Sequence, residues 1–371
     1  MNEFSLLIKP ASADCNMRCR YCFYLEKSAL YPEDKVHRMK DATLERIISS
    51  YMKTSQGCYT FGWQGGEPSL MGLDFFKKVV DLQKRYGKAG SIVYNGLQTN
   101  ATLIDDDFAR HFSDYKSLLG VSLDGPRYIH DHYRKFTGGH GTFDRVMRGI
   151  EILRRNNVEF NILVLVNDFN VNKAAEVYRF LVDSGFYFHQ YIPCVEFDSQ
   201  YSLEPFSING EQWGSFLIEL FNQWYPRDIY KVSIRLFDSI LNHLIGRKAT
   251  ICHMEDNCNQ YLVVEHNGDV YPCDFFVRED LKLGNIKDNS WEDLISSAAY
   301  LDFGKAKSSY SFICSSCQYL KYCYGDCLKH RNFNPNYSKK LSSLCSGWKM
   351  FYKHSLEIFK EIADGFKNNN N

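Results

Sequence analysis

Three cysteines near the N-terminus have the residue type and spacing of a cluster-binding site. Cys15, Cys19 and Cys22 stand at i, i+4 and i+7, after a short apolar run at 4–8. Iron–sulfur clusters are held by cysteine thiolates, and a cubane cluster needs four ligands, one for each iron. Three thiolates would leave one iron without a protein ligand and open to a substrate. Catalytic zinc sites likewise keep one coordination position open. The same three cysteines could instead form a partial zinc site or be reduced thiols at the surface.

The composition of the chain limits the kinds of partner and the cellular compartment that we expect. The chain has 371 residues, and its 44 basic and 44 acidic residues cancel, so bulk charge does not indicate a nucleic-acid or membrane partner. No apolar run reaches the roughly 18 residues that span a bilayer, and residues 1–3 lack the basic start of a signal peptide. We therefore expect a cytoplasmic protein, and a monomer. Thirteen cysteines in a reducing compartment indicate metal ligation rather than disulfides.

Strands and helices alternate through the first half of the chain. The predicted strands are 4–9, 59–63, 91–98, 118–123, 159–166 and 188–192. Between them apolar residues recur at helical spacing, as in the segment that follows Asp41, a candidate N-cap, and in 174–182, which Gly185 closes. Six such units predict an α/β fold whose parallel sheet curls into a partial barrel. Active sites of such barrels lie at the carboxyl ends of the strands, and the cysteine loop follows the first strand.

Small or polar residues follow later strands of the predicted sheet. The motif Gly65-Gly66-Glu67-Pro68 lets a ligand approach the backbone closely, or forms an ordinary turn. Ser122 ends the fourth strand, and Val195 follows the sixth. Arg134 lies in the segment after the fourth strand; its guanidinium could bind a carboxylate through two hydrogen bonds, or be solvated. Gly65, Gly66 and Arg134 are therefore candidate ligand contacts.

A second group of cysteines lies in the last third of the chain. Its members are Cys252, Cys258, Cys273, Cys314, Cys317, Cys323, Cys327 and Cys345. Asn267-Gly268 between two β-type runs predicts a hairpin just before Cys273. Eight cysteines are enough for two zinc ribbons or for two complete iron–sulfur sites. Cys58 and Cys194 are left over, and we interpret them as small buried hydrophobic residues.

These motifs resemble the radical S-adenosylmethionine (SAM) enzymes in the first half of the chain and their SPASM extension in the second. Along nearly the whole chain they resemble the anaerobic sulfatase-maturating enzymes, through the segments 7–12, 64–68, 97–100 and 271–275. The resemblance implies a partial (β/α)6 TIM-like barrel over 1–235 and a cysteine-rich SPASM domain with a C-terminal helix over 236–371.

The resemblance also implies the cofactors, which are SAM and three [4Fe–4S] clusters. The first cluster would be held by Cys15, Cys19 and Cys22. The second would be held by Cys252, Cys258, Cys273 and Cys327. The third would be held by Cys314, Cys317, Cys323 and Cys345. The implied SAM contacts are Tyr21, Gly65, Gly66, Glu67, Ser122, Arg134 and Val195.

The activity implied by the resemblance is radical oxidation of an active-site Cys or Ser of a sulfatase to Cα-formylglycine. The partners would be an unfolded or nascent sulfatase and an electron donor such as flavodoxin or ferredoxin. Asp274 follows the cluster ligand Cys273, and a carboxylate there can act as general base or simply stabilise a turn.

Two other functions are compatible with the motifs. A peptide maturase would form thioether or carbon–carbon crosslinks or epimers, but many such enzymes carry an N-terminal recognition domain, and the first strand here begins at residue 4. A ferredoxin-like electron carrier would have no use for an open cluster beside Gly65, Gly66 and Arg134.

Overall fold

The computed structural model describes residues 3–331 and 341–368. They form two compact units. The first unit comprises 1–122, 133–160 and 259–304, and the second comprises 123–132, 161–258 and 305–371. The segment 259–304 therefore packs with the N-terminal residues, although it is distant from them in sequence. The division into domains at 1–235 and 236–371 remains a prediction.

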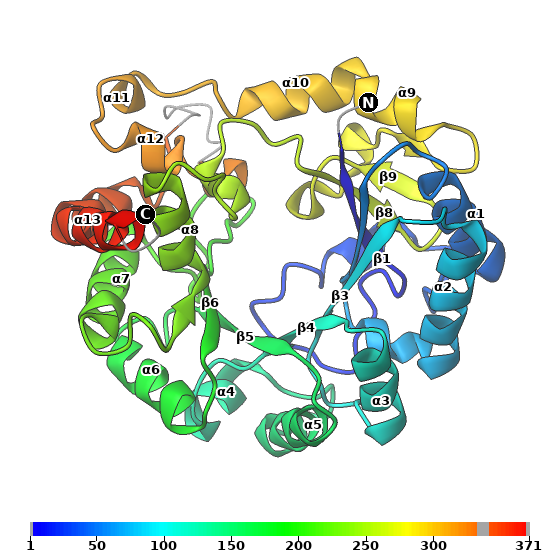
Figure 1. Cartoon of the computed structure of the whole chain (residues 1–371), viewed down its shortest axis with the longest axis horizontal. Coiled ribbons are helices and arrows are strands. Elements are labelled where there is room, and N and C mark those ends of the chain that lie inside the picture. The colour runs from blue at the N-terminus through cyan, green and yellow to red at the C-terminus, as the bar shows by residue number, and fades with distance from the viewer. Residues whose placement is uncertain (1–2, 332–340, 369–371) are drawn as a thin grey trace. The chain divides into compact units, whose positions relative to one another are not determined.

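The first unit is built on a sheet that joins early and late parts of the sequence (Figure 1). Its parallel strands in spatial order are β8 (Tyr261–Glu265), β1 (Ser5–Lys9), β2 (Cys58–Trp63), β3 (Ile92–Thr99) and β4 (Leu118–Ser122). Antiparallel strands β9 (Asp269–Tyr271) and β10 (Gly284–Asn285) continue the sheet beyond β8. The four early strands agree with the prediction. The parallel pairing of β8 with β1 was not predicted.

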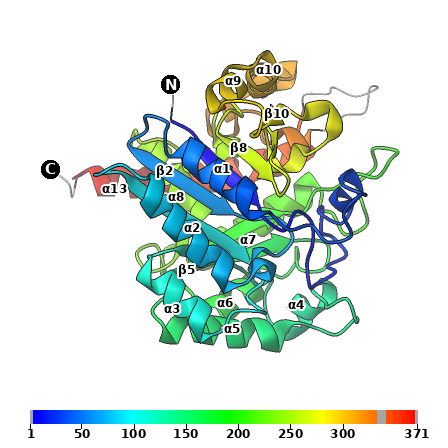
Figure 2. The same ribbon diagram turned by 90° about the vertical axis from the view of Figure 1, so that its right-hand side faces the viewer.

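Helices cover this sheet, and α1 and α2 lie along it side by side (Figures 1 and 2). The helices of the unit are α1 (Asp41–Tyr51), α2 (Leu73–Tyr86), α3 (Asp106–Asp114), α5 (Phe143–Arg155) and α9 (Trp291–Ser296). The N-cap of α1 is Lys40, whose backbone is extended, and Asp41 is the first helical residue. The predicted cap is therefore wrong by one position, because Asp41 acts as a first-turn acid that favours the positive end of the helix dipole.

The hairpin predicted at Asn267-Gly268 is present between β8 and β9. Gly268 has a φ of 96°, a left-handed conformation that glycine adopts without strain. Val263, Tyr271 and Val277 form a buried cluster beneath this hairpin, with Leu7 of β1 packed against it. This packing fixes Cys273 and Asp274, which follow β9, close to the end of β1.

The second unit contains three strands of the sheet and includes the longest helix, α13. Its parallel strands are β5 (Phe160–Val166), β6 (Phe188–Pro193) and β7 (Ser233–Ile234). Its helices are α6 (Ala174–Asp183), α7 (Gly210–Trp224), α8 (Arg235–Leu244), α11 (Phe312–Ser315), α12 (Leu320–Cys323) and α13 (Cys345–Asn368). Two helices, α4 (Arg127–Tyr133) and α10 (Ala298–Ala306), span a division between the units. Gly185, with a φ of 74°, follows α6 as predicted.

Helices α7 and α13 approach closely through glycines. A Cβ on Gly347 would lie 2.1 Å from the backbone oxygen of Gly210, and one on Gly214 would lie 2.8 Å from the Cα of Gly347. This contact holds the start of α13, and therefore Cys345, against the unit. None of the described helices combines the length and apolar character needed to cross a bilayer.

Candidate active site

The first three cysteines lie on the loop that follows β1. The Cys22 amide donates to the Cys19 carbonyl at 3.0 Å. The Cys15 sulfur accepts from the Met17 amide at 3.3 Å and from Asn100 Nδ2 at 3.7 Å. Burial, then the charges of Glu67, Cys19 and Cys22, raise the pKa of Cys15 to about 12. Three neighbouring thiols with donors aimed at one sulfur fit a metal cluster, whose binding would displace the thiol proton.

The glycine motif after β2 docks against this loop. The Gly66 amide donates to the Ser12 carbonyl at 2.7 Å, and the Glu67 amide donates to the Asp14 carbonyl at 2.8 Å. A Cβ on Gly66 would lie 2.0 Å from the Asp14 oxygen, so no larger residue fits. The close backbone approach predicted for Gly65 and Gly66 is therefore made, at least in part, to the chain itself. Their contact with SAM remains a prediction.

Glu67 joins the carboxyl ends of β2 and β3. Its side chain is buried, and it accepts hydrogen bonds from the Ser69 amide and hydroxyl, the Thr99 hydroxyl and the Asn100 amide. Burial raises the pKa of Glu67 above its ordinary value in spite of these donors. The side chain therefore aligns Asn100 toward Cys15, a structural task that the sequence motif alone did not indicate.

Tyr21 and Arg134, distant in sequence, are brought together beside the cysteine loop. The Arg134 guanidinium carbon lies 5.5 Å from the centroid of the Tyr21 ring. The Arg18 amide donates to the Lys135 carbonyl at 2.8 Å, which ties the two segments together. Ser122 is the last residue of β4 in the same unit, whereas the buried Val195 belongs to the second unit.

Asp274 lies in a buried polar pocket of the first unit. Its Oδ2 accepts from Gln64 Nε2 at 3.2 Å and from the hydroxyl of Tyr24. Its Oδ1 has no hydrogen-bond donor among the described residues and lies 3.4 Å from Lys9 Nζ. Burial and the charge of Asp274 raise the pKa of Tyr24 well above its ordinary value, so that Tyr24 stays a neutral donor.

Lys9 connects this pocket to a buried carboxylate on the neighbouring strand. Lys9 and Glu265 are register partners in β1 and β8, and Nζ lies 2.9 Å from Oε1. Burial alone would raise the pKa of Glu265, but the charge of Lys9 and hydrogen bonds from His266, Lys9 and Ser12 together lower that pKa to about 2. Burial likewise opposes the charge on Lys9, yet Glu265 and Asp274 raise its pKa. The two side chains are fully buried as an ion pair.

Sequence reasoning missed four residues of this pocket, namely Lys9, Tyr24, Gln64 and Glu265. Two signals were available. Lys9 is a charged residue directly after the apolar run 4–8, and Gln64 directly precedes the glycine motif. Neither signal identified a partner, because β8 had not been paired with β1.

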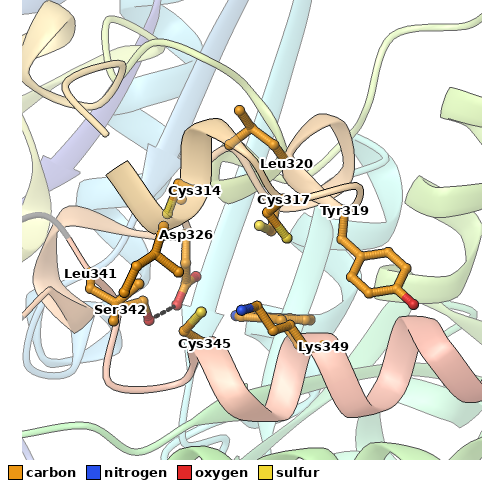
Figure 3. Close-up of a pocket in the computed structure, with 13 residues that line it drawn as sticks. Cys314, Cys317, Tyr319, Leu320, Asp326, Leu341, Ser342, Cys345 and Lys349 are labelled. Atoms are coloured by element: carbon orange, nitrogen blue, oxygen red, sulfur yellow. Dashed lines mark hydrogen bonds between the residues drawn. The ribbon is translucent and has the colours of Figure 1, made fainter. Parts of the chain in front are cut away.

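Four of the later cysteines line one cavity of the second unit (Figure 3). They are Cys314, Cys317, Cys323 and Cys345, and the cavity has about 390 Å³ of empty space. This is the set predicted for the third cluster, and four thiols around one space fit a fully ligated group. For the second cluster, Cys273 belongs to the first unit, whereas Cys252, Cys258 and Cys327 belong to the second. That ligand set remains a prediction.

The two remaining cysteines differ in burial. Cys194 is buried, as predicted. Cys58, the first residue of β2, is only half-buried, so the prediction of a buried side chain is wrong for it.

Comparison with known proteins identifies two families in the chain. Residues 10–181 match the Radical SAM superfamily, and residues 252–318 match SPASM, an iron–sulfur cluster-binding domain. A serine-type anaerobic sulfatase-maturating enzyme of Bacteroides thetaiotaomicron is 36% identical over 94% of this chain and 88% of its own. A cysteine-type enzyme of Clostridium perfringens is 35% identical over 99% of this chain and 100% of its own. The chain belongs to the anaerobic sulfatase-maturating enzymes.

A solved structure of this enzyme family matches the whole fold. Native anSMEcpe with bound AdoMet and Kp18Cys peptide has a TM-score of 0.91 and 35% identity, and the match covers 98% of this chain and 99% of that one. The predicted α/β fold with a radical SAM partial barrel and a SPASM domain is thereby confirmed. Membership of the two families likewise confirms SAM and iron–sulfur clusters as the cofactors of this sulfatase-maturating enzyme.

Proposed function

We propose that this enzyme oxidises a Cys or Ser side chain of a sulfatase polypeptide to Cα-formylglycine. The observation that carries the proposal is the match, over at least 94% of the chain, to sulfatase-maturating enzymes of both the serine type and the cysteine type. The bound peptide in the matching structure supports a polypeptide substrate.

The cofactors would supply, when bound, a radical that removes a Cβ hydrogen atom and an acceptor for the remaining electron. The residue proposed to remove the proton from the substrate sulfur or oxygen is Asp274. Its Oδ2 is held by Tyr24 and Gln64, and its Oδ1, which lacks a donor, is the atom left to accept a proton. Lys9 at 3.4 Å from Oδ1 balances the carboxylate charge.

The reaction balances with one base. Loss of a hydrogen atom, a proton and an electron from the substrate side chain forms C=S from Cys or C=O from Ser. Water then hydrolyses the thioaldehyde, releasing hydrogen sulfide and leaving the aldehyde. With Ser no hydrolysis is needed, so one site can serve both residues.

We assign the SAM contacts by family position. Arg134 is proposed to pair with the SAM carboxylate, for which its guanidinium beside Tyr21 is suited. Gly65, Gly66 and Glu67 are proposed to contact the amino group. Ser122 is proposed to contact the ribose or carboxylate region, and Val195 the adenine.

We also propose a cytoplasmic monomer that receives electrons from flavodoxin or ferredoxin. Arg18 and Arg20 are exposed on the cysteine loop and offer positive charge to an acidic electron carrier. Reduction by such a carrier should slow as ionic strength rises, because salt screens exposed charges. A rate that is independent of salt would argue against this docking surface.

The direct test is anaerobic incubation of the reconstituted enzyme with SAM, a reductant and peptides of sulfatase type, Cys/Ser-x-Pro/Ala-x-Arg. Mass spectrometry should show conversion of the Cys or Ser side chain to an aldehyde. A matched peptide with Ala in place of Cys or Ser is the control. Crosslinked or epimerised peptides without aldehyde would instead identify the protein as a peptide maturase.

A further inference from the structure

The second unit buries two cations without a carboxylate partner. Lys307 and Arg331 are 0% and 1% exposed. Among the described residues neither forms an ion pair with Asp or Glu. Lys307 Nζ donates to the backbone carbonyls of Cys252 and His253 at 3.0 and 2.8 Å. Burying a charge without a compensating charge is strongly unfavourable, so this arrangement requires an explanation.

Within 3–331 and 341–368, the hydrogen-bond partners of the Arg331 side chain are likewise backbone groups. The carbonyls that its guanidinium contacts belong to Ala306, Lys307, Ser309, Tyr324, Gly325 and Asp326. The shortest contact is 2.7 Å, from Nη2 to the Lys307 carbonyl. Carbonyl oxygens satisfy the donors but carry no net charge. Both cations thus donate to neutral carbonyl oxygens, which do not balance their charge.

Asp326, the carboxylate nearest to Arg331 in sequence, directs its Oδ2 to other side chains. It is buried, its Oδ2 accepts from the Ser342 hydroxyl at 2.6 Å, and it lies 2.9 Å from His330 Nδ1 (Figure 3 shows the Ser342 bond). Arg331 contacts only the backbone oxygen of Asp326. Neither cation therefore has a carboxylate in contact among the described residues.

Cysteines are the candidates near both cations. The carbonyl that accepts from Lys307 Nζ at 3.0 Å belongs to Cys252, a predicted ligand of the second cluster. Arg331 Nε donates at 3.1 Å to the Gly325 carbonyl, on the loop between the predicted ligands Cys323 and Cys327. Four thiolates on a [4Fe–4S] cluster bring net negative charge. Each buried cation therefore lies near a predicted ligand of an auxiliary cluster.

The chain around Arg331 is shaped to hold a guanidinium. Gly325, between Cys323 and Cys327, has a φ of 71°, and a Cβ there would lie 2.7 Å from Arg331 Nη2. Glycine thus leaves room for the cation against the cysteine-bearing loop. A guanidinium needed only as a surface charge would not require this space.

We infer that Lys307 and Arg331 balance the charge of the auxiliary clusters and raise their reduction potentials. Reduction adds negative charge to a cluster, so a buried cation favours the reduced form, and net charge is a known determinant of cluster potential. A higher potential makes the clusters better acceptors for the electron that leaves the substrate. The inference rests on the proposed function only for the presence of the clusters.

The test is a potentiometric titration of the reconstituted full-length protein, followed by EPR. In Lys307→Met and Arg331→Met the oxidised-to-reduced ratio of an auxiliary cluster at a fixed potential should rise about tenfold, which is 59 mV for a one-electron couple. Lys349→Met is the control, because Lys349 is a cation that lines the cavity of the four cysteines but is exposed. Water should screen its charge, so the shift should be much smaller.

Three results decide the inference. Potentials in both Met variants that equal those of Lys349→Met, with iron and sulfide retained, would overturn it. If the Met variants lose iron, the variants Lys307→Arg and Arg331→Lys are used instead. They keep the positive charge but change the shape of the side chain, so they show which of the two properties matters. Retention of iron and potential by these charge-keeping variants supports the inference, and equal loss refutes it. Since no step requires formylglycine, a failed peptide assay would leave the titration interpretable.

Discussion

Two regions of this enzyme bury cations, and they balance the charge in different ways. Lys9 in the first unit has two carboxylates beside it, Glu265 at 2.9 Å and Asp274 at 3.4 Å. Among the described residues, the hydrogen-bond partners of Lys307 and Arg331 in the second unit are backbone carbonyls. In the first region the chain itself supplies the counter-charge, whereas we infer that in the second the cofactors supply it. The base pocket should therefore form without metal, and the cysteine region should not reach full stability without it.

The largest expected effect is the loss of SAM cleavage. It should arise at the reaction centre, outside the two regions compared above. Replacing Cys15, Cys19 and Cys22 together by Ala should abolish SAM cleavage, because it removes the ligands of the open cluster. Iron analysis and EPR should still detect two auxiliary clusters, since their predicted ligands are other cysteines. Formation of 5′-deoxyadenosine by this variant, or loss of all iron, would contradict the assignment.

Asp274→Asn tests the base within the first region. Removal of a general base typically lowers the rate by about 10²–10⁴-fold, so formylglycine should fall by that factor. Hydrogen abstraction needs no base, and SAM cleavage should largely persist. Both products are measured in one reaction, with Asp269→Asn, outside the pocket, as a control. Equal and near-native yields of 5′-deoxyadenosine and aldehyde would eliminate Asp274 as the base.

A double-mutant cycle tests whether Lys9 and Glu265 stabilise each other in the first region. Lys9→Met leaves two buried carboxylates without their cation, and removal of one partner of a buried pair costs about 3–5 kcal/mol. Lys9→Met/Glu265→Gln should be less destabilised than Lys9→Met alone, because one of the unbalanced charges is also removed. Anaerobic urea denaturation measures the free energy of unfolding. Simple additivity of the two single variants would show that the pair is not coupled.

Iron removal should produce a smaller and local effect that differs between the regions. After anaerobic chelation, amide hydrogen exchange should accelerate around 305–331, where Lys307 and Arg331 lose their counter-charge. Strands β1 and β8 should change less, because Lys9 keeps its carboxylates. An equal increase of amide exchange in both regions would contradict the proposed difference between them.

Periodicity and motif spacing predicted much of the fold from sequence alone. The six early strands are present within two residues of their predicted ends, because alternating strands and amphipathic helices leave a local signature in the order of apolar residues. Gly185 and Asn267-Gly268 were predictable for the same reason, since left-handed turns select residues at single positions. The family resemblance likewise grouped Cys314, Cys317, Cys323 and Cys345, and these four cysteines line one cavity.

Only the tertiary structure decided which distant residues share a pocket. The sequence placed Asp274 beside a cluster ligand, but its neighbours Lys9, Tyr24 and Gln64 precede it by at least 210 residues. They meet because β8 pairs in parallel with β1 and sets Glu265 opposite Lys9. Strand pairing across such a separation has no local signal, since it depends on the packing of whole elements. The buried charges of Lys307 and Arg331 were hidden for the same reason, because a lysine or arginine in sequence normally predicts a solvated surface.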